Sequence, residues 1–538
     1  MIPTYRLPNP LDFTGRFGAP VVLLALALGA AAWAPARWTL VGLVPLLALA
    51  LWDFFQTRHS LRRNYPLLAR LRWAMEDLRP FARAYIVEGD LEGTPFNHDQ
   101  RELIYARASG ALDAHPFGTE LDVYSEEYDW LGHSIAPNAA APEEWRLGIG
   151  GPQCANPYPS ALLNVSAMSF GSLSGNAIEA LNLGAKNGGF AHDTGEGGLS
   201  PYHRKHGGDI IWEIGSGYFG CRDRHGNFDA ALFAETAQSD QVKMVEIKLS
   251  QGAKPGHGGV LPGAKVTREI AETRRVPQGE DCVSPAAHST FSTPVGLVEW
   301  AAKLRELSGG KPVGAKLCIG QPHEFLAVMK AMLETGILLD FLVIDGAEGG
   351  TGAAPVELSN SVGMPLREGL ILARNALVGT RLKQHVRLGA SGKVHSGAGL
   401  AMNFALGADW CNAARAFMFA LGCVQSMKCH TGACPTGIAT QDPLRQRGLV
   451  VGDKAARVTR FQRHTLAALR EIVVAMGLDN PWQIAPDQLM RRVSSARSDP
   501  VDRIYGFLDE GQLLDDPGST RLGRYWAMAR ADTFRRSA

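Results

Sequence analysis

The sequence is poor in cysteine and has no excess of charge of either sign. Eight cysteines in 538 residues are too few for the disulfide framework of a secreted protein, so the chain is predicted to face a reducing compartment. Lys and Arg number 54 and Asp and Glu 53. This balance argues against a nucleic-acid partner.

A dinucleotide-binding fingerprint is also missing, because we find no G-x-G-x-x-G within a strand–helix–strand unit. The chain is therefore not expected to bind NAD(P)H itself. Glycine, in contrast, is abundant at 60 residues and clusters in the middle of the chain. Such clusters predict tight turns and close approach of the backbone to a ligand.

Two apolar runs lie near the N-terminus. Residues 17–34 carry no charge, and residues 38–55 carry only Asp53. Each run has about eighteen residues, the lower limit for crossing a ~30 Å hydrocarbon core, and the short linker favours an antiparallel hairpin. Five arginines between Arg58 and Arg72 follow the second run, against a single one in the linker, which places both ends in the cytoplasm. A cleaved signal peptide is the alternative, because "AAAWA" resembles a cleavage site.

The rest of the chain reads as a barrel. From about residue 160, short β-rich runs alternate with helical patterns, which is typical of a parallel sheet with crossover helices. The expected strands are residues 162–168, 189–193, 243–249, 282–285, 312–318, 340–346, 386–392 and 408–414, and helices are expected over 174–187, 295–308, 322–336 and 398–406. Eight strands close a (β/α)8 TIM barrel, whereas a doubly wound sheet usually has about six.

The predicted fold class is thus α/β, with an organisation in four parts. The parts are a transmembrane hairpin (1–56), a helical or irregular connector packed on the barrel (57–150), the barrel (151–445), and a C-terminal helical extension and tail (446–538). Within the last part, residues 453–476 have the apolar periodicity of an amphipathic helix. The catalytic body is expected in the cytoplasm, tethered to the cytoplasmic membrane.

Two glycine-containing segments follow the last two expected strands, where such barrels bind phosphate. They read "SGKVHSGAG" (391–399) and "NAARAFMFALG" (412–422), and Lys393 and Arg415 would add positive charge. Backbone N–H groups at such turns suit a phosphate dianion, so a cofactor such as FMN is the natural interpretation. Ordinary turn chemistry would explain either loop alone.

Three further loops carry candidate chemistry. "EIKLSQGAKPGHGGVLPGAKVT" (246–267) spreads cationic and amide side chains through a glycine-dense segment suited to a small dicarboxylate or a flavin edge, although a solvated basic turn is the alternative. "AHDTGEGGLSPYH" (191–203) places Glu196 between glycines, where it is either catalytic or bound to backbone amides. "IDGAEGGTGAAP" (344–355) would let the backbone approach a flat ring.

Three cysteines lie close together in "GCVQSMKCHTGACPTG", residues 422–437. A disulfide would leave one thiol over, and zinc would need His430, whose adjacency to Cys429 makes joint ligation awkward. An iron–sulfur cluster tolerates such a loop, and Cys434 is followed by proline as in bacterial ferredoxins. Spacing alone therefore favours a cluster over zinc, with incidental cysteines as an open alternative.

Taken together, these motifs resemble the synthase region of glutamate synthase. The matching segments are "SAMSFGSLS" (166–174), "TGEGG" (194–198), "QGAKPG" with "LPG" (251–263), "GGTGA" (349–353) and the C-x5-C-x4-C-P-x-G run (423–437), in the family's order. The chain is also similar to the shorter, membrane-tethered group of FMN-binding glutamate-synthase-like proteins.

The resemblance implies a barrel of FMN-binding type and a 3Fe-4S cluster that passes electrons to the FMN. In that family 2-oxoglutarate and ammonia form 2-iminoglutarate, and reduced FMN reduces this imine to L-glutamate. The catalytic and substrate residues implied are Glu196, Lys248, Gln251, Lys254 and Arg274. The FMN-binding residues implied are Ala167, Met168, Ser169, Lys316, Gly349, Gly350, Ser391, Gly392, Lys393, Ala414 and Arg415, and the cluster ligands are Cys423, Cys429 and Cys434.

The sequence departs from the family in three respects, and one of them is that the family's C-terminal glycine-repeat β-helix is not found. The family's glutaminase half is not found, so ammonia is expected from solution or a partner. A separate electron donor, ferredoxin-like or a reductase subunit, is also expected. In the substrate loop, His257 and Val260 stand where the family usually has Glu and Gln. Loss of an amide that contacts substrate predicts changed specificity. The alternatives are therefore another amino or imino acid, such as an N-substituted glutamate, or a non-aminating electron-transfer subunit.

Overall fold

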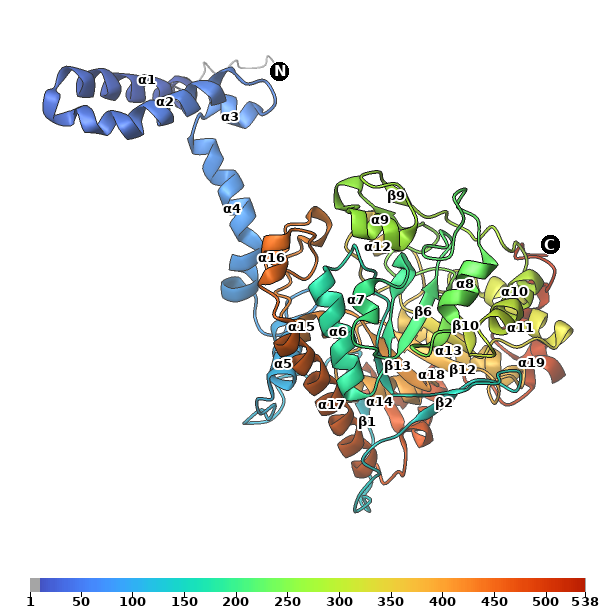
Figure 1. The fold of residues 1–538 in the computed structure, drawn as a ribbon. Coiled ribbons are helices and arrows are strands. Elements are labelled where there is room, and N and C mark those ends of the chain that lie inside the picture. Colours follow the sequence, from blue (N-terminus) through green and yellow to red (C-terminus); the bar gives the residue numbers. More distant parts are fainter. Residues whose placement is uncertain (1–9, 538) are drawn as a thin grey trace, which may run out of the picture. The chain divides into compact units, whose positions relative to one another are not determined.

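The computed structural model describes residues 10–537, so the first nine residues of the expected hairpin segment lie outside the described residues. The chain divides into two compact units at Thr94, with Pro95 beginning the second (Figure 1). The boundary falls inside the expected connector, 57–150. Residues 57–94 therefore belong to the first unit, and residues 95–150 share the second with the barrel and the C-terminal extension.

The first unit is helical. Its elements are α1 (Pro10–Ala32), η1 (Ala34–Thr39), α2 (Leu40–Phe55), α3 (Ser60–Asn64), α4 (Leu68–Ala82) and η2 (Arg83–Val87). The rings of Phe17 and Phe54 lie 5.3 Å apart, so the start of α1 meets the end of α2 and the two helices form an antiparallel hairpin. Asp53 is fully buried and accepts hydrogen bonds at 2.8 Å from both Nε and Nη2 of Arg70.

Only part of this hairpin has the length and composition of a membrane span. Among the described residues, one continuous helical stretch, Ala34–Phe55, is long and apolar enough to cross a membrane. The apolar part of the first helix, Arg16–Ala32, is shorter than a span. The expected pair of spans, 17–34 and 38–55, is thus reduced by these criteria to one candidate.

The second unit is built on a closed barrel of eight parallel strands, which confirms the predicted (β/α)8 fold. In spatial order the strands are β4 (Leu163–Val165), β5 (His192–Asp193), β6 (Ile210–Ile214), β7 (Val242–Lys248), β10 (Val313–Leu317), β11 (Phe341–Asp345), β12 (Arg387–Ser391) and β13 (Trp410–Ala413). Their short, almost wholly buried runs are typical of strands covered on both faces.

One of the eight predicted strands was wrong. The segment 282–285 contributes only β9 (Cys282–Val283), which pairs antiparallel with β8 (Val260–Leu261) outside the barrel. The eighth strand of the barrel is instead β6, which was not predicted and which lies between β5 and β7. Segment 282–285 does not join the barrel because its strand is short and partly exposed. Val283 is 58% exposed, whereas all five residues of β6 are buried.

The helices follow the strands as the predicted pattern requires. Those of the second unit are α5 (His98–Ser109), α6 (Gly175–Gly188), α7 (Pro201–Arg204), α8 (Ala230–Ala237), α9 (Arg268–Arg274), α10 (Pro294–Leu307), α11 (Pro322–Thr335), α12 (Val356–Ser361), α13 (Leu366–Gly379), α14 (Gly397–Ala405), α15 (Arg415–Leu421), α16 (Pro443–Arg447), α17 (Val451–Ala475), α18 (Val501–Tyr505), α19 (Gln512–Asp515) and α20 (Gly523–Met528). Helix α17 confirms the predicted amphipathic helix and packs against α5 and α6 (Figure 1). A small sheet of β1 (Asp129–Leu131), β14 (Leu489–Ser494) and β15 (Arg497–Pro500), and the pair β2 (Leu147–Ile149) and β3 (Tyr158–Ser160), complete the unit.

A glycine fingerprint does occur after β6, contrary to the sequence prediction. Residues Gly215–Gly220 read "GSGYFG" between β6 and α8. A dinucleotide site requires that such a loop open a helix, but α8 begins only at Ala230. A side chain on Gly215 would meet Glu196 Cβ at 2.9 Å, so this glycine serves close packing.

Candidate active site

A cavity of about 330 Å³ opens where the C-terminal ends of the barrel strands meet. This volume lies within the range of small-molecule and cofactor pockets, about 300–1,000 Å³. Every residue proposed from the sequence for the substrate and for FMN lines it, as do Cys423 and Cys429. Cys434 does not line the cavity and is buried. The convergence follows from the fold, because parallel strands deliver their C-terminal residues to one mouth.

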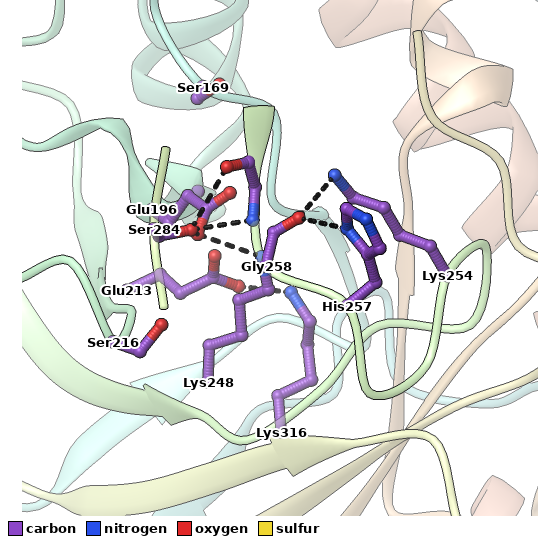
Figure 2. A network of polar contacts seen from close by, with 12 residues as sticks. Ser169, Glu196, Glu213, Ser216, Lys248, Lys254, His257, Gly258, Ser284 and Lys316 are labelled. Carbon is purple, nitrogen blue, oxygen red and sulfur yellow. Dashed lines mark hydrogen bonds and ion pairs between the residues drawn. The ribbon is translucent and has the colours of Figure 1, made fainter. Parts of the chain in front are cut away.

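Glu196 and Lys248 form the centre of the polar wall. Lys248 Nζ lies 3.2 Å from Glu196 Oε2, and the Ser284 hydroxyl donates to the same oxygen at 3.2 Å (Figure 2). Burial would raise the pKa of Glu196, but the charges of Lys248 and Arg274 outweigh it and lower this pKa to about 2. Glu196 is therefore an ionised hydrogen-bond acceptor at neutral pH.

The substrate loop places a second ammonium beside this pair. Lys254 is 3% exposed and its Nζ donates to the Gly258 carbonyl at 2.9 Å (Figure 2). Burial lowers the pKa of Lys254, which makes an incoming carboxylate a favourable partner. Val260 forms part of the cavity wall and is 40% exposed, so position 260 is apolar within the site. His257 is exposed and does not line this cavity.

Arg274 supplies a third cation. Its Nη2 donates to the Phe170 carbonyl at 3.0 Å and to Ser169 Oγ at 3.3 Å, and its guanidinium lies 5.2 Å from the Phe219 ring centroid. Its Nε is buried and has no hydrogen-bond partner in the part of the chain that the structure describes. Gln251 lies on the same wall. Lys248, Lys254 and Arg274 against Glu196 give a net charge of +2, which complements a dicarboxylate.

The opposite end of the cavity has the features of a phosphate site. Lys393 follows β12 and holds φ at 47°, a conformation that costs a non-glycine residue of order 1 kcal/mol and is often found at functional sites. Arg415 follows β13 and donates from Nη2 to the Glu348 carbonyl at 2.6 Å. An added side chain at Gly350 would meet the Arg415 guanidinium at 3.2 Å, so the glycine leaves that group room.

Orphaned donors in the cavity wall provide a test for a bound cofactor. Asn412 is 1% exposed and its Oδ1 accepts from Trp410 Nε1 at 3.1 Å. Its Nδ2 has no hydrogen-bond partner among the described residues. Asn412 and Arg274 thus face the cavity with unused buried N–H donors, which are costly without an acceptor. Acceptor atoms of a flavin ring or a substrate carboxylate would satisfy them, so the residues fit such a ligand.

The three clustered cysteines lie beside this cavity. All eight cysteines, which fall within the described residues, are free thiols. Burial raises the pKa of Cys423 to about 12, with added effects of Cys429 and Cys434, so the three thiols are close enough to interact. Burial would raise the pKa of Cys434, but hydrogen bonds from backbone N–H groups outweigh this effect and lower the pKa. Gln425 N–H donates to Cys423 Sγ at 3.5 Å. Hydrogen bonds to sulfur are typical of iron–sulfur ligands, so this loop fits a cluster.

Sequence reasoning missed several cavity residues. Ser284, Asn412, Phe96 and Glu213 all line the cavity or hold a residue that does. Ser284 was visible only as a residue of an expected strand, and Asn412 only as a strand residue that begins the expected phosphate segment 412–422. Glu213 lies on the missed strand β6. Phe96 lies 70 residues before Ser166, the next cavity residue along the chain. Gln425 exchanges two hydrogen bonds with the Phe96 backbone at 3.0 and 3.2 Å. No local motif marks that contact.

Fold and cavity together define an α/β barrel with a cationic cavity at the C-terminal ends of its strands, which is where enzymes of this fold carry their active sites. A family model for the conserved region in glutamate synthase matches residues 157–479. The glutamate synthase large subunit-like protein YerD of Bacillus subtilis is 33% identical over 511 residues, covering 86% of this chain and 97% of that protein. The chain therefore belongs to the glutamate synthase family, and it is an oxidoreductase of glutamate synthase type.

Two further similarities are more limited. The archaeal glutamate synthase (NADPH) of Archaeoglobus fulgidus is 35% identical over 327 residues, and the match covers 60% of this chain and 61% of that protein. A solved flavocytochrome b2 variant with pyruvate bound aligns at a TM-score of 0.41 and 13% identity, over 77% of this chain and 91% of that chain. The family assignment rests on the sequence matches.

Proposed function

We propose that the protein is an FMN- and iron–sulfur-dependent oxidoreductase that reduces 2-iminoglutarate, formed from 2-oxoglutarate and ammonia, to L-glutamate. The observation that carries this proposal is the cavity that joins three cations, one ionised carboxylate and a phosphate-type end in a single space. FMN, when bound and reduced, supplies a hydride to the imine carbon. The protein supplies binding, orientation and charge.

Each wall residue has a role in this scheme. Lys254 and Arg274 bind the two substrate carboxylates, because their charges are buried and one guanidinium nitrogen is unpaired. Lys248, held by Glu196 at 3.2 Å, donates a proton to the nitrogen that becomes the amino group. Gln251 completes the contact with the substrate. Lys316, Asn412, Lys393 and Arg415 hold the cofactor from its ring to its phosphate.

Cys423, Cys429 and Cys434 would hold a 3Fe-4S cluster through their three thiolates, and the cluster would supply electrons to the flavin. A separate donor, ferredoxin-like or a reductase subunit, reduces the cluster, and ammonia comes from solution or a partner. The hairpin of α1 and α2 tethers the protein to the cytoplasmic membrane. Exposed apolar side chains along it, such as Val41 at 81% and Trp38 at 76%, support this role.

A second candidate function is the same chemistry on another imino acid, such as an N-substituted glutamate. Val260 favours it, because an exposed valine in the cavity wall offers no hydrogen bond to a polar substrate group. A bulkier apolar substituent would instead pack there.

The test is an assay of the full chain containing FMN and cluster. Protein reduced by a chemical donor is given 2-oxoglutarate and ammonium, and glutamate is measured against a panel of other keto acids with and without amines. Glutamate formed at the highest kcat/KM supports the first candidate. Preference for an N-substituted product supports the second. No amination of any keto acid by protein with both cofactors intact would mark it as an electron-transfer subunit.

A further inference from the structure

Four charged residues meet in the barrel interior next to the cavity. We call Asp193, Glu213, Glu246 and Lys316 the interior charge cluster. They lie on strands β5, β6, β7 and β10, and they are 0%, 2%, 0% and 3% exposed. Glu213 and Lys316 line the cavity, and Lys316 forms a close ion pair with Glu213 (Figure 2).

The strand register forces the acids together. Glu213 and Glu246 are direct neighbours across the β6–β7 pairing, and Asp193 stands one strand further on, opposite Ile211. One oxygen from each of the three carboxyl groups lies within 4.8 Å of the others. Like charges on neighbouring strand positions are destabilising, and burial increases the cost.

The cluster also has too few hydrogen-bond donors for its carboxylate oxygens. Gly195 N–H donates to Asp193 Oδ1 at 2.9 Å, but Asp193 Oδ2 and both oxygens of Glu246 are buried without a hydrogen-bond partner among residues 10–537. Lys316 Nζ lies 3.6 Å from Glu246 and is engaged by Glu213. Two carboxylates that face each other with no donor between them are stable only if they share a proton.

The neighbouring strands bring few other titratable groups. Asp345 at the end of β11 acts on Lys316 and accepts the Gly252 N–H at 2.9 Å. Toward the cavity, β12 and β13 present Ser391 and Asn412, and Ser166 follows β4. These three are hydroxyl and amide groups that do not titrate. Lys248, the last residue of β7, is the register partner of Lys316 and forms an ion pair with Glu196 at 3.2 Å. Within the described residues the balance is therefore set by the cluster together with Asp345, Lys248 and Glu196.

We propose that Glu246 and Asp193 share one proton at neutral pH, and that ionised Glu213 then holds Lys316 as a fixed cation at the base of the cofactor cavity. With this proton the cluster carries a net charge of −1; without it the charge would be −2. Asp193, Glu213 and Glu246 are thus positioning residues for Lys316. The assignment of Lys316 to the cofactor rests on the proposed function, whereas the shared proton does not.

The electrostatics agree with this geometry. Burial and Asp193 raise the pKa of Glu246 well above its usual range, and burial with Glu213 raises the pKa of Asp193. Burial would lower the pKa of Lys316, but Glu213 and Glu246 outweigh it and raise that pKa. A divalent cation bound by the three acids is the competing arrangement, and it would displace the Lys316 ammonium.

The experiment is infrared spectroscopy of the full-length protein at neutral pH, with and without added FMN. We expect the C=O stretching band of a protonated carboxyl group, shifted in D2O. Glu246→Gln should abolish this band. Glu213→Gln, the same change on the facing residue, should retain it. Absence of the band from the wild type, or its survival in Glu246→Gln, would overturn the proposal, as would its loss on adding Mn²⁺ or Mg²⁺.

A second measurement tests the consequence for the cofactor. In protein reconstituted with FMN, Glu213→Gln should raise the flavin midpoint potential at neutral pH, because a real negative charge is removed. Glu246→Gln should leave the flavin midpoint potential at neutral pH unchanged. At higher pH, where Glu246 ionises, the wild-type potential should fall, and Glu246→Gln should abolish this fall. Equal shifts in both variants at neutral pH would contradict the shared proton. If the protein binds no FMN, the proposed function fails while the infrared result stands on its own.

Discussion

Glu196 and Lys248 face each other across 3.2 Å in the cavity wall, and each comes from a different barrel loop or strand end. Glu196 stands in the turn after β5, whereas Lys248 is the last residue of β7. The ion pair fixes the ammonium toward the cavity and keeps the carboxylate charged. Several properties of the enzyme should depend on this one contact.

Replacing Glu196 by Gln should lower kcat/KM for the amination reaction. Charge-assisted hydrogen bonds contribute about 1.5–3 kcal/mol, so the loss should be roughly 10–100-fold. Steady-state kinetics with a chemical electron donor would measure it. The matched control is Glu306→Gln, which removes an exposed ion pair with Lys303 on α10. A Glu196→Gln enzyme as active as the control would contradict the role of this pair.

The same residue predicts a pH dependence of stability. The pKa of Glu196 is lowered to about 2 in the folded protein, against about 4.3 in an unfolded chain. Because the folded pKa is the lower one, its contribution is fully present above about pH 4.3 and is lost as pH falls toward 2. Chemical denaturation should therefore give a wild-type advantage over Glu196→Gln that is constant near neutrality and shrinks below about pH 4.3. An advantage that grew with acidity would refute this.

Val260→Gln should improve the use of 2-oxoglutarate. Val260 lines the cavity and makes no polar contact there, and one added hydrogen bond contributes about 0.5–1.5 kcal/mol. The KM for 2-oxoglutarate should fall roughly 2–10-fold with little change in kcat. Val260→Leu is the apolar control. If Gln at this position lowers turnover of every keto acid tested, the natural substrate instead needs an apolar contact at this point.

Arg415→Ala should weaken binding of FMN. Arg415 lies next to Lys393 at the proposed phosphate end, and a lost charge-assisted contact of about 1.5–3 kcal/mol predicts a roughly 10–100-fold rise in Kd. Fluorescence titration of flavin-depleted protein would measure it. Arg387→Ala, at the start of β12 and outside the cavity, serves as the control. Equal affinities in the two variants would move the phosphate elsewhere.

The sequence was most informative where chemistry is local. Glycine-flanked motifs located Glu196, Lys254, Lys393 and Arg415, and the parallel barrel explains why such distant loops meet. Seven of the eight barrel strands were placed, but β6 was missed because its apolar run is short and interrupted by Glu213.

The contacts that the sequence did not predict depend on strand register and on long-range packing. Strand pairing sets Glu213 beside Glu246, and no periodicity in either strand reveals it. The contact of Phe96 with Gln425 joins segments 329 residues apart. The ion pair between Glu196 and Lys248 likewise could not be predicted from the sequence. The two residues lie in separate motifs, and only the fold brings them together.

Replacing any of the three clustered cysteines should remove the iron. Cys429→Ser is the sharpest variant, because Cys429 is half-buried and its carbonyl is held by Lys265 Nζ at 2.8 Å, so the loop keeps an anchor without the thiol. We expect loss of iron and of the cluster's visible absorption, with FMN retained. Cys154→Ser, outside the cavity, is the control. Iron content unchanged in Cys429→Ser would leave the cysteines without a metal role.

The apolar hairpin should determine where the protein is found in the cell. Val44 lies near the middle of the helical stretch Ala34–Phe55 and is 53% exposed. An arginine at the centre of a membrane span costs about 2.5–3.5 kcal/mol, so Val44→Arg should move protein from the membrane fraction to the soluble fraction. Val44→Leu, which keeps the apolar surface, should not. Ultracentrifugation of lysates after a carbonate wash measures the distribution, with glutamate formation assayed in both fractions. Because the cavity is formed wholly by residues from Pro95 onward, the released variant should retain its kcat. If wild type and Val44→Arg partition alike, the hairpin packs on protein rather than on lipid.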